Sequence, residues 1–573
     1  MSTSKYQSIL ESNELPVNLD ELPNFKIKVP SQDIFASYYS ASSDSEVQMQ
    51  VAVLFINELD KLIKEKNTDG LLVLYDVQFN KICSSVFKES AWPAPHEIEL
   101  YQDKEIDIDI AYLYSELCYR HALARLQNSF DAELVCNSWE NYNDIFDTVI
   151  HAQTEFPLPV PWIWDIIDEY IYQFYFACRW RYTIKPEDQA QEGFQNEAQY
   201  DIYRVSIKDS LKEILAKDSR DLTFWNLENI NENFTSVIQK SQIFEKGVLT
   251  LKEATSTSHY FGFFTLVGQL RLNVLIGNYD AAIKSIENLD FDSLVIFSKA
   301  FPAYFNLFYY AGFAYLMTGR YKEAVKVLES VCLMMNKYKA FLTKSSQSEN
   351  MMKQLEKAVC LFAISLVFYP NKASESTFWQ FKDLGIKTSK QNSQNRNEKE
   401  RIVDKFDKLQ RYDIQTFNEL FNYGCPKLIE PIQSLDSFKD ITNKNTSDLI
   451  INAKEKLTKE FKVVQNLNNL ATVMKLYSKI NLQKAASIVN VSKDEFLNLL
   501  KQYEKRETSD LLKTPFEQTV LSRFFLPTPI LKFDINGDNI TINEVVPVKN
   551  YTEQYQKLNK KMTEIYSDVL SLL

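Results

Sequence analysis

The sequence is poor in glycine, with only 11 among its 573 residues. That is about 2%, against an average usage near 7% in proteins. Few glycines mean few tight turns and few loops that could cradle a phosphate. Neither G-x-G-x-x-G nor G-x-x-x-x-G-K-[ST] occurs, so the two common nucleotide-binding loops are excluded. Long helices are the natural expectation.

A basic surplus, a long apolar run and paired cysteines are also missing. The net charge is −12, which disfavours nucleic-acid binding over the whole surface. The seven cysteines form no C-x-x-C pair, and buried thiols in a reducing compartment explain an odd count. The sequence contains no stretch of 18 apolar residues that would predict a membrane span, and its amino terminus lacks the basic and apolar pattern of a secretory signal. We expect a cytoplasmic protein with no membrane, metal or cofactor.

The apolar pattern that is present predicts a mainly α fold built from helical hairpins. LRLNVLIGNYDAAIKSI (270–286) is echoed by GFAYLMTGRYKEAVKVL (312–328), where Gly277, Tyr279 and Ala282 each recur 42 residues later. The echo predicts a helix, a Gly-x-Tyr turn and a second helix that carries a small residue where helices cross. Such tetratricopeptide-like hairpins must stack to bury their apolar faces, which predicts a helical-repeat solenoid.

One helical segment carries the only candidate catalytic cluster. PWIWDIIDEYIYQFYF (161–176) places Asp165, Asp168 and Glu169 at positions i, i+3 and i+4, on one face of a helix. Aromatic and aliphatic residues cover the rest, so we interpret this segment as a core helix with one acidic edge toward water. No nucleophile, histidine or metal-binding set is recognisable nearby. His121 is expected to be packed or hydrogen-bonded, since it lacks the H-E-x-x-H spacing of a zinc site.

Within residues 371–402, the polar tract KTSKQNSQNRNEKER (387–401) is predicted to be a solvated loop or disordered insertion. It has almost no apolar residues. The few positive charges leave a weak RNA contact open.

Residues 471–507 change character and predict a helix-turn-helix. A short helix ends at Val489, and Ser492 with Glu495 fits a capping box at the start of a second helix. A β-hairpin should follow at LKFDINGDNITI (531–542), with Asn536-Gly537 as a type I′ turn. That turn places Phe533 opposite Ile540 and Leu531 opposite Ile542, all four on one face.

A helix-turn-helix followed by a hairpin is a winged helix, a module that binds either DNA or proteins. The second helix, 493–507, carries four basic and four acidic side chains. A helix that reads a DNA groove should present a basic face, so protein binding is favoured.

The carboxyl-terminal segment 549–573 predicts a helix with a narrow apolar heptad stripe. From Tyr551 on, apolar side chains recur in steps of four and three. This heptad stripe suits packing against one or two partner helices, with docking onto the chain's own body as the alternative. The candidate partner-interface residues are Tyr555, Leu558, Met562, Ile565, Val569 and Leu572.

Five runs of the sequence resemble one known family. They are LYSELCYRHALARL, PWIWDIIDEYIYQF, FFTLVGQLRLNVLIGNYDAAIKSIENL, YYAGFAYLMTGRYKEAVKV and FNYGCPKLIEP. In this order they resemble the subunit L family of eukaryotic translation initiation factor 3, one of the PCI-domain families, over roughly residues 75 to 570. The first 50 or so residues and the 387–401 tract diverge.

The resemblance implies a non-catalytic scaffold subunit of initiation factor 3. That complex binds the 40S ribosomal subunit and supports pre-initiation complex assembly for mRNA translation. It further implies that the winged helix packs beside those of other PCI subunits in an arc and that the last helix joins a shared bundle. The implied neighbours are subunit K and, through the core, subunits E and C. No catalytic residue is transferred by the resemblance.

The predicted organisation has five parts, from a flexible amino-terminal segment to the heptad helix. They are 1–30, the helical domain 31–245, the helical-repeat part 246–440 with its polar loop 387–401, the winged-helix part 441–548 of the PCI domain, and 549–573. Alternative functions are a PCI subunit of the proteasome lid or the COP9 signalosome, and a winged-helix protein that binds nucleic acid alone. An enzyme that uses Asp165 is the most distant alternative.

Overall fold

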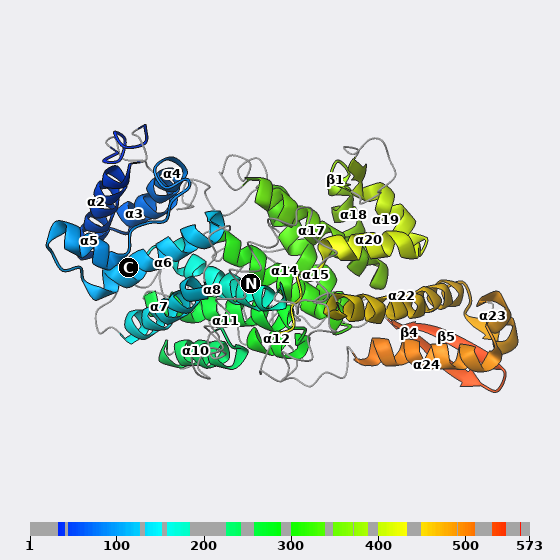
Figure 1. The fold of residues 1–573 in the computed structure, drawn as a ribbon. Helices are drawn as coiled ribbons and strands as arrows, with labels where there is room; N and C mark the ends of the chain where they lie inside the picture. The colour runs from blue at the N-terminus through cyan, green and yellow to red at the C-terminus, as the bar shows by residue number, and fades with distance from the viewer. Residues whose placement is uncertain are drawn as a thin grey trace, which may run out of the picture. The chain divides into compact units, whose positions relative to one another are not determined.

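The computed structural model is mainly helical (Figure 1). Among the residues that it describes, none of the helices combines the length and the apolar character that a bilayer crossing requires. The described residues are 33–40, 44–126, 132–151, 157–183, 225–241, 257–287, 300–337, 348–370, 372–387, 399–431, 448–489, 491–509, 530–545 and 562.

The chain divides into two compact units, each with its own core. The amino-terminal unit comprises the described residues of Leu19–Gly319 and Cys425–Asn452. The carboxyl-terminal unit comprises the described residues of Arg320–Gly424 and Ala453–Leu573. The five-part organisation predicted from the sequence stays a prediction.

The amino-terminal unit is a set of packed helices in which α11 contacts α8, α10, α12 and α14. Residues 425–431 return to this unit, where the amide of Ile429 donates a 2.8 Å hydrogen bond to the carbonyl of Leu275. The elements are α2 (Ser45–Lys64), α3 (Thr68–Leu72), the π-helix η3 (Val73–Phe79), α4 (Asn80–Ser85), α5 (Pro95–Gln102), α6 (Ile108–Arg125), α7 (Ala132–His151), α8 (Val160–Thr183), α10 (Leu227–Lys240), α11 (Thr257–Leu275), α12 (Tyr279–Ser285) and α14 (Phe301–Met317).

Helix α8 is the predicted core helix, and the structure confirms it. Its side chains Trp162, Trp164 and Phe174 are almost completely buried. Trp164 meets Phe264 of α11 edge to face, with 5.5 Å between the ring centres, an arrangement that aromatic pairs favour. The apolar residues cover most of the helix surface, so α8 has neighbours on nearly every side.

The internal echo corresponds to two similar helix-turn-helix segments. Gly277 follows α11 with φ +82°, and Gly319 follows α14 with φ +79°. Both lie in the left-handed region, where a side chain is strained and where helices commonly end in glycine. The two small residues of the echo, Ala282 and Ala324, are fully buried. The predicted order of helix, glycine turn and helix is therefore confirmed at both places, and α11 and α12 also pack on each other.

The carboxyl-terminal unit opens with further helices and a small hairpin. Its elements up to Gly424 are α15 (Tyr321–Lys337), α17 (Ser348–Phe368), α18 (Lys372–Phe378), the 3-10 turn η7 (Trp379–Phe381), β1 (Gly385–Lys387), β2 (Lys399–Arg401), α19 (Ile402–Gln410) and α20 (Ile414–Gly424). Strands β1 and β2 pair antiparallel, with Gly385 opposite Arg401.

The prediction of a solvated loop over 387–401 was therefore wrong at its two ends, since Lys387 and Lys399–Arg401 belong to paired strands. The residues just before this tract include Phe378, Phe381 and Leu384, which are buried. Phe378 packs against Phe406 with 4.5 Å between the ring centres. These apolar side chains hold α18 and the hairpin on the unit, and residues 388–398 between the strands lie outside the described part of the chain.

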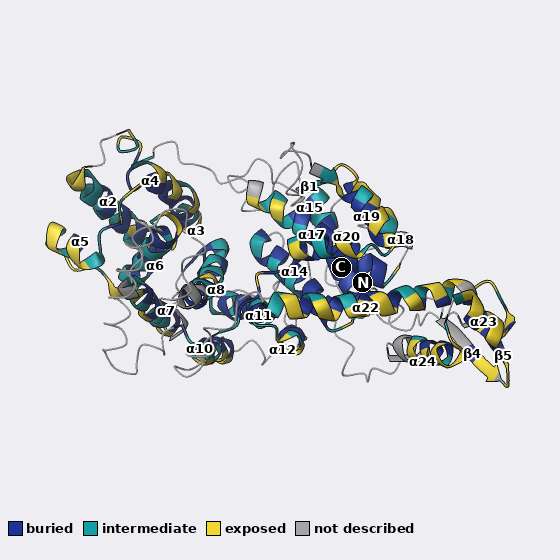
Figure 2. Cartoon of the chain, turned by 45° about the vertical axis from the view of Figure 1, so that its right-hand side comes forward, coloured by how far each residue is buried: buried dark blue, intermediate teal, exposed yellow. Residues whose placement is uncertain are grey.

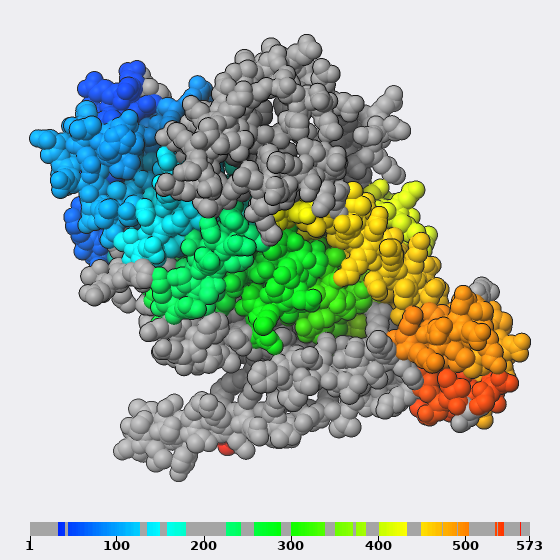
Figure 3. Space-filling view, turned by 60° about the horizontal axis from the view of Figure 1, so that its bottom comes forward, coloured from blue at the N-terminus to red at the C-terminus, as the bar shows by residue number. Residues whose placement is uncertain are grey.

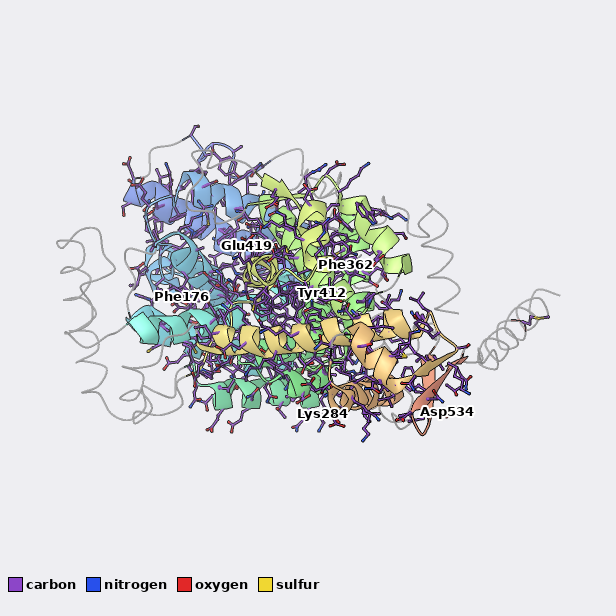
Figure 4. The ribbon with its side chains drawn as sticks, turned by 90° about the vertical axis from the view of Figure 1, so that its right-hand side faces the viewer. Phe176, Lys284, Phe362, Tyr412, Glu419 and Asp534 are labelled. Carbon is purple, nitrogen blue, oxygen red and sulfur yellow. The ribbon has the colours of Figure 1, made fainter. Side chains whose placement is uncertain are left out.

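Helix α22 (Asp448–Met474) joins these helices to the last module of the unit. The side-chain amide of Asn468 donates to the hydroxyl of Tyr412 over 3.0 Å. Phe461 packs against the ring of Tyr412 at 5.4 Å and against Phe417 at 4.7 Å. Figure 4 labels Tyr412 close to α22 and Phe362 in the helical part of the same unit. One face of α22 is thus buried, whereas Figure 2 shows much of its length exposed on the opposite side.

The left-handed turn after α11 leads to a stability prediction. A side chain at position 277 would meet no atom within 4 Å, so a Gly277→Ala substitution tests backbone strain without a steric clash. We expect a loss of about 1 kcal/mol in the free energy of unfolding, measured by urea denaturation. The Gly277→Asn variant should lose less free energy of unfolding than Gly277→Ala, because asparagine tolerates the left-handed backbone region better than alanine does. Equal stability of Gly277→Ala and the unmodified chain would contradict the left-handed turn.

Candidate partner interface

The predicted heptad stripe lies almost entirely outside the described residues. Met562 is the one member that the structure describes, and its side chain is 66% exposed. The other candidates, Tyr555, Leu558, Ile565, Val569 and Leu572, fall where nothing is described. Their role at a partner interface stays a prediction.

The winged helix predicted from the sequence is present in the carboxyl-terminal unit. It comprises the end of α22, strand β3 (Lys479–Asn481), helices α23 (Leu482–Val489) and α24 (Lys493–Ser509), and strands β4 (Ile530–Asn536) and β5 (Asn539–Val545). The strands form a sheet of order β3-β5-β4. Figure 3 shows the helices and the strands of this module in contact, in orange and red.

A continuous apolar core holds the module together. Met474, Phe496 and Ile540 are fully buried in it, one from each of α22, α24 and β5. Tyr503 at the rim meets Phe533 of β4 edge to face, with 5.6 Å between the ring centres. The core explains why the helices up to Ser509 and the hairpin that begins at Ile530 form one structure.

The predicted capping box at the start of α24 is confirmed. The hydroxyl of Ser492 accepts the backbone amide of Glu495 over 3.3 Å. In return, the carboxylate of Glu495 accepts the backbone amide of Ser492 over 3.2 Å. This reciprocal pair satisfies two amides that have no partner inside the helix.

The predicted hairpin register was wrong by one position in the turn. The two loop residues are Gly537 and Asp538, since Asn536 pairs with Asn539. Phe533 lies opposite Ile542 and not opposite Ile540. Gly537 has φ +65°, whereas Asp538 has no positive φ. Glycine at the first loop position with a normal second residue fits a type II′ turn, not the type I′ turn that Asn-Gly suggests.

Contacts to the helices account for this turn. The carbonyl of Asp538 accepts the amide of Leu482, the first residue of α23, over 2.7 Å. The carboxylate of Asp538 binds the ammonium of Lys493 over 2.8 Å, and this bond raises the pKa of Lys493. Both bonds require Asp538 in the loop, so tertiary contacts decide a choice that the local sequence leaves open. The buried face is the same in either register.

The module also presents unpaired backbone and apolar side chains. Strand β4 pairs only with β5, so its second edge has no partner strand among the described residues. Ile535 on β4 is 45% exposed, and Leu476, in the turn between α22 and β3, is 75% exposed. Ile488 of α23 is exposed as well, and Figure 4 shows labelled Asp534 on the hairpin. An open edge beside apolar side chains can accept a further strand or a flat apolar surface.

The acidic edge of α8 is only partly exposed to water. Asp165 and Glu169 are half-buried, and Asp165 accepts the hydroxyl of Tyr75 over 2.5 Å. Asp168 forms an ion pair with Arg271 of α11, and its side chain is 36% exposed. The expected acidic edge is present, but its carboxylates also have partners on the π-helix η3 and on α11.

A buried ion pair lies at the centre of these contacts. The guanidinium of Arg120 binds Glu116 one helical turn earlier, through Nε at 3.1 Å. Glu116 is completely buried and also accepts the hydroxyl of Tyr142 over 3.2 Å. Arg120 further donates to the hydroxyl of Tyr75, which stacks on Trp162 at 4.8 Å. We call the side chains of Tyr75, Glu116, Arg120, Asp165 and Glu169 the α6–α8 polar network.

This network was missed in the sequence, although a signal for its centre exists. Glu116 and Arg120 are four residues apart on a helix, the spacing of an intrahelical ion pair. Nothing in the sequence indicates that Tyr75 joins them. The imidazole of His121, on the same helix, lies 3.2 Å from the carbonyl oxygen of Ser90, which confirms the expected hydrogen-bonded histidine. Burial lowers the pKa of His121.

Burial also raises the pKa of both carboxyl groups of α8. The pKa of Asp165 rises from 3.8 to about 7, chiefly through burial, while Arg120 lowers it. The pKa of Glu169 rises to about 7 for the same reasons, with a hydrogen bond from Gln173 that also lowers it. In the part of the chain that the structure describes, no group of three histidine, cysteine or acidic side chains is placed to hold a metal ion.

These pKa shifts predict that the amino-terminal unit loses stability as the pH rises. The folded state binds protons at Asp165 and Glu169 more tightly than the unfolded state, so the free energy of unfolding falls between about pH 4 and about pH 7. We expect the thermal midpoint to fall over this range. The thermal midpoint of the double variant Asp165→Asn/Glu169→Gln should fall less steeply with pH, because neither replaced side chain can ionise.

Glu58→Gln is a suitable control, since Glu58 belongs to the exposed ion pair with Lys61. Thermal unfolding of the three proteins across this pH range gives the comparison. An unchanged pH slope in the double variant would show that the two carboxyl groups do not titrate as described.

Comparison with known proteins places this architecture in a family. The sequence model of the family described as RNA polymerase I-associated factor PAF67 matches residues 135–562. The chain is also similar to proteins named eukaryotic translation initiation factor 3 subunit L. The one from Nematostella vectensis is 27% identical over 497 residues, which cover 83% of this chain and 85% of the relative.

The relatives from vertebrates are similar over comparable lengths. The subunit L of Danio rerio is 26% identical over 538 residues, 93% of this chain and 87% of its own. That of Homo sapiens is 26% identical over 508 residues, 86% of this chain and 82% of its own. The resemblance to the subunit L family inferred from five sequence runs is confirmed. The chain belongs to the family of RNA polymerase I-associated factor PAF67, and its curated relatives are subunits L of translation initiation factor 3.

Proposed function

We propose that this chain is a non-catalytic scaffold subunit of eukaryotic translation initiation factor 3. The observation that carries the proposal is similarity to subunit L of that factor over 83 to 93% of this chain. The likeness spans both compact units, so it concerns the whole architecture and not one shared module. In this role the chain binds other subunits of the complex and supports assembly on the 40S ribosomal subunit.

The winged helix is the part of the structure best suited to subunit contacts. Among the described residues, one edge of β4 has no partner strand and can offer its backbone groups to a neighbouring sheet, and Ile535 of β4 is exposed. Hydrogen bonds along an added strand give affinity, and adjacent side chains give specificity. Repeating this contact from one PCI subunit to the next produces the arc that the family resemblance implies.

The carboxyl-terminal heptad stripe supplies a second contact in this proposal. Leu558, Met562, Ile565 and Val569 recur at spacings that suit a helical bundle. Met562 is exposed, as a residue that awaits partner helices should be. The neighbours that we propose are subunit K and, through the shared core, subunits E and C.

A non-catalytic role agrees with the contacts of the acidic residues. Asp165 binds Tyr75, Asp168 binds Arg271, and Glu169 binds Gln173 over 3.2 Å. Each carboxyl group therefore has a structural partner within the helical core. Five of the seven thiols are buried, which suits a reducing compartment, and we propose that the protein acts in the cytoplasm.

Independent DNA binding is less well supported by the winged helix. The first turn of a recognition helix carries the residues that contact bases. In α24 this turn contains Asp494 and Glu495, both exposed, and Lys493 is engaged by Asp538. Carboxylates at this position repel the phosphate backbone.

Removal of the heptad stripe tests the proposal directly. A chain truncated after Asn550 should no longer purify with the other subunits, because the bundle would lose one helix. The measurement is mass spectrometry of tagged full-length and truncated chains purified from the native organism. Full incorporation of the truncated chain would rule out the bundle contact.

The same experiment distinguishes the alternative assemblies. Initiation factor subunits and 40S proteins should accompany the full-length chain. Proteasome-lid or COP9 signalosome subunits, or RNA polymerase I subunits in view of the family description, would instead contradict the proposal.

The open edge of the winged helix has its own test. Ile535→Asp combined with Leu476→Asp adds two charges at exposed positions, so the module should still fold, as circular dichroism can check. We expect the double variant to lose at least tenfold in the amount of complex recovered, since each charge would be desolvated at an interface. Ile414→Asp, at an exposed position on α20, is the matched control and should be recovered normally. Equal recovery of both variants would show that this surface has no partner.

A further inference from the structure

An exposed apolar patch lies on the amino-terminal unit, far along the chain from the winged helix. It comprises Leu100 and Tyr101 at the end of α5 and Ile108 at the start of α6, and we call it the α5–α6 patch. Leu100 is 82% exposed and Ile108 is 62% exposed, and Tyr101 is exposed as well. Single exposed apolar residues are common on proteins, but large ones grouped in nine positions mark an interaction site.

The loop between the two helices keeps this patch compact. The amide of Ile106 donates to the carboxylate of Glu99 over 2.9 Å, which brings the chain back to α5 before α6 begins. Leu100 is the next residue after Glu99, and Ile108 follows Ile106 by two positions. On the other side, Asn57 of α2 donates to the side chain of Gln102 over 3.2 Å. These two bonds fix α5 against its neighbours.

The patch lies in an acidic stretch of the chain. Residues 97–109 contain six acidic side chains and a single lysine, Lys104, a concentration unlike that of the chain as a whole. Asp103 and Glu105 are exposed in the loop itself. Among the described residues, no ion pair joins these six carboxylates to a basic side chain.

Three of the six carboxylates accept hydrogen bonds from backbone amides, and these bonds do not remove their negative charge. Glu97 accepts the amide of Ala94 over 3.0 Å at the start of α5. Asp107 accepts the amide of Asp109 over 3.3 Å at the start of α6, and Glu99 closes the loop as described. Hydrogen bonds from neutral amides position these carboxylates without neutralising them. These three carboxylates are therefore held in place on the same two helices and loop that carry the apolar side chains.

We infer that the α5–α6 patch binds a partner protein through a basic segment with apolar side chains. Leu100 and Ile108 would be covered by the apolar side chains, and lysine or arginine residues would pair with the surrounding carboxylates. The charge excludes the other common occupants, since nucleic acid and anionic lipid surfaces would both be repelled. This second interface does not depend on which assembly the winged helix joins.

A peptide of defined charge tests the inference on the purified full-length chain. The probe is a fluorescent amphipathic helical peptide with leucine on one face and lysine on the other. Its control is the same peptide with glutamate in place of lysine. Fluorescence anisotropy should detect binding of the lysine peptide only. Raising the salt concentration from about 50 mM to about 500 mM should weaken it at least tenfold, because screening removes most of the attraction.

Two variants locate the binding site. The double variant Leu100→Ser/Ile108→Ser removes apolar contact and should weaken binding of the lysine peptide at least tenfold. Asp103→Asn/Glu105→Gln removes charge and should flatten the salt dependence. The control variants Trp379→Ser and Glu455→Gln/Glu460→Gln alter exposed apolar and acidic residues elsewhere on the chain. They should change neither the affinity for the lysine peptide nor its salt dependence. Equal loss in the control variants, or binding of the glutamate peptide, would overturn the inference.

A photo-crosslinking amino acid at position 100 tests the patch in the native complex. It should attach to a segment of another subunit that carries net positive charge, identified by mass spectrometry of the cross-linked peptides. The same amino acid at position 379 is the control. Cross-links only to this chain, to RNA or to an acidic segment would overturn the inference, whatever the fate of the proposed function.

Discussion

The burial of bulky side chains along α8 is the constraint on which the amino-terminal unit depends. Trp162, Trp164 and Tyr170 are almost completely removed from water, and an aromatic side chain buries roughly 150 to 250 Å². At about 25 cal/mol per Å², each contributes several kcal/mol as an upper estimate. A helix packed on most sides leaves its acidic residues only partly solvated, so those residues need partners inside the protein.

The α6–α8 polar network follows from that constraint. Glu116 loses all contact with water, and an unpaired buried carboxylate would cost several kcal/mol. Arg120 removes this cost by binding Glu116, and Tyr75 then connects the pair to Asp165. Acidic side chains in a helical core can resemble an active site in the sequence. Here Asp165 accepts a hydrogen bond from Tyr75 and Glu169 accepts one from Gln173, so both have partners within the protein.

The sequence predicted the parts of the fold that depend on local patterns. The Gly-x-Tyr turns at Gly277 and Gly319, the capping box at Ser492 and the winged helix all follow from spacing along the chain. The register of the hairpin could not be predicted, because the bonds from Asp538 to Leu482 and Lys493 come from other elements. The environment of Asp165 was missed for the same reason, since Tyr75 is 90 residues away. The heptad stripe was predicted in most detail, but Met562 is its only member among the described residues, so the stripe stays a prediction.

Charge distinguishes the α5–α6 patch from the winged-helix surface. Residues 97–109 hold six acidic residues and one lysine, whereas the described parts of the winged helix at 475–489, 491–509 and 530–545 hold eight basic and seven acidic residues. A basic partner segment that suits the first surface therefore gains little from charge at the second. A scaffold that must bind several partners in fixed places needs such discrimination, because apolar contact alone does not distinguish one partner from another. The net charge of −12 conceals this division, which becomes visible only when each charge is assigned to its surface.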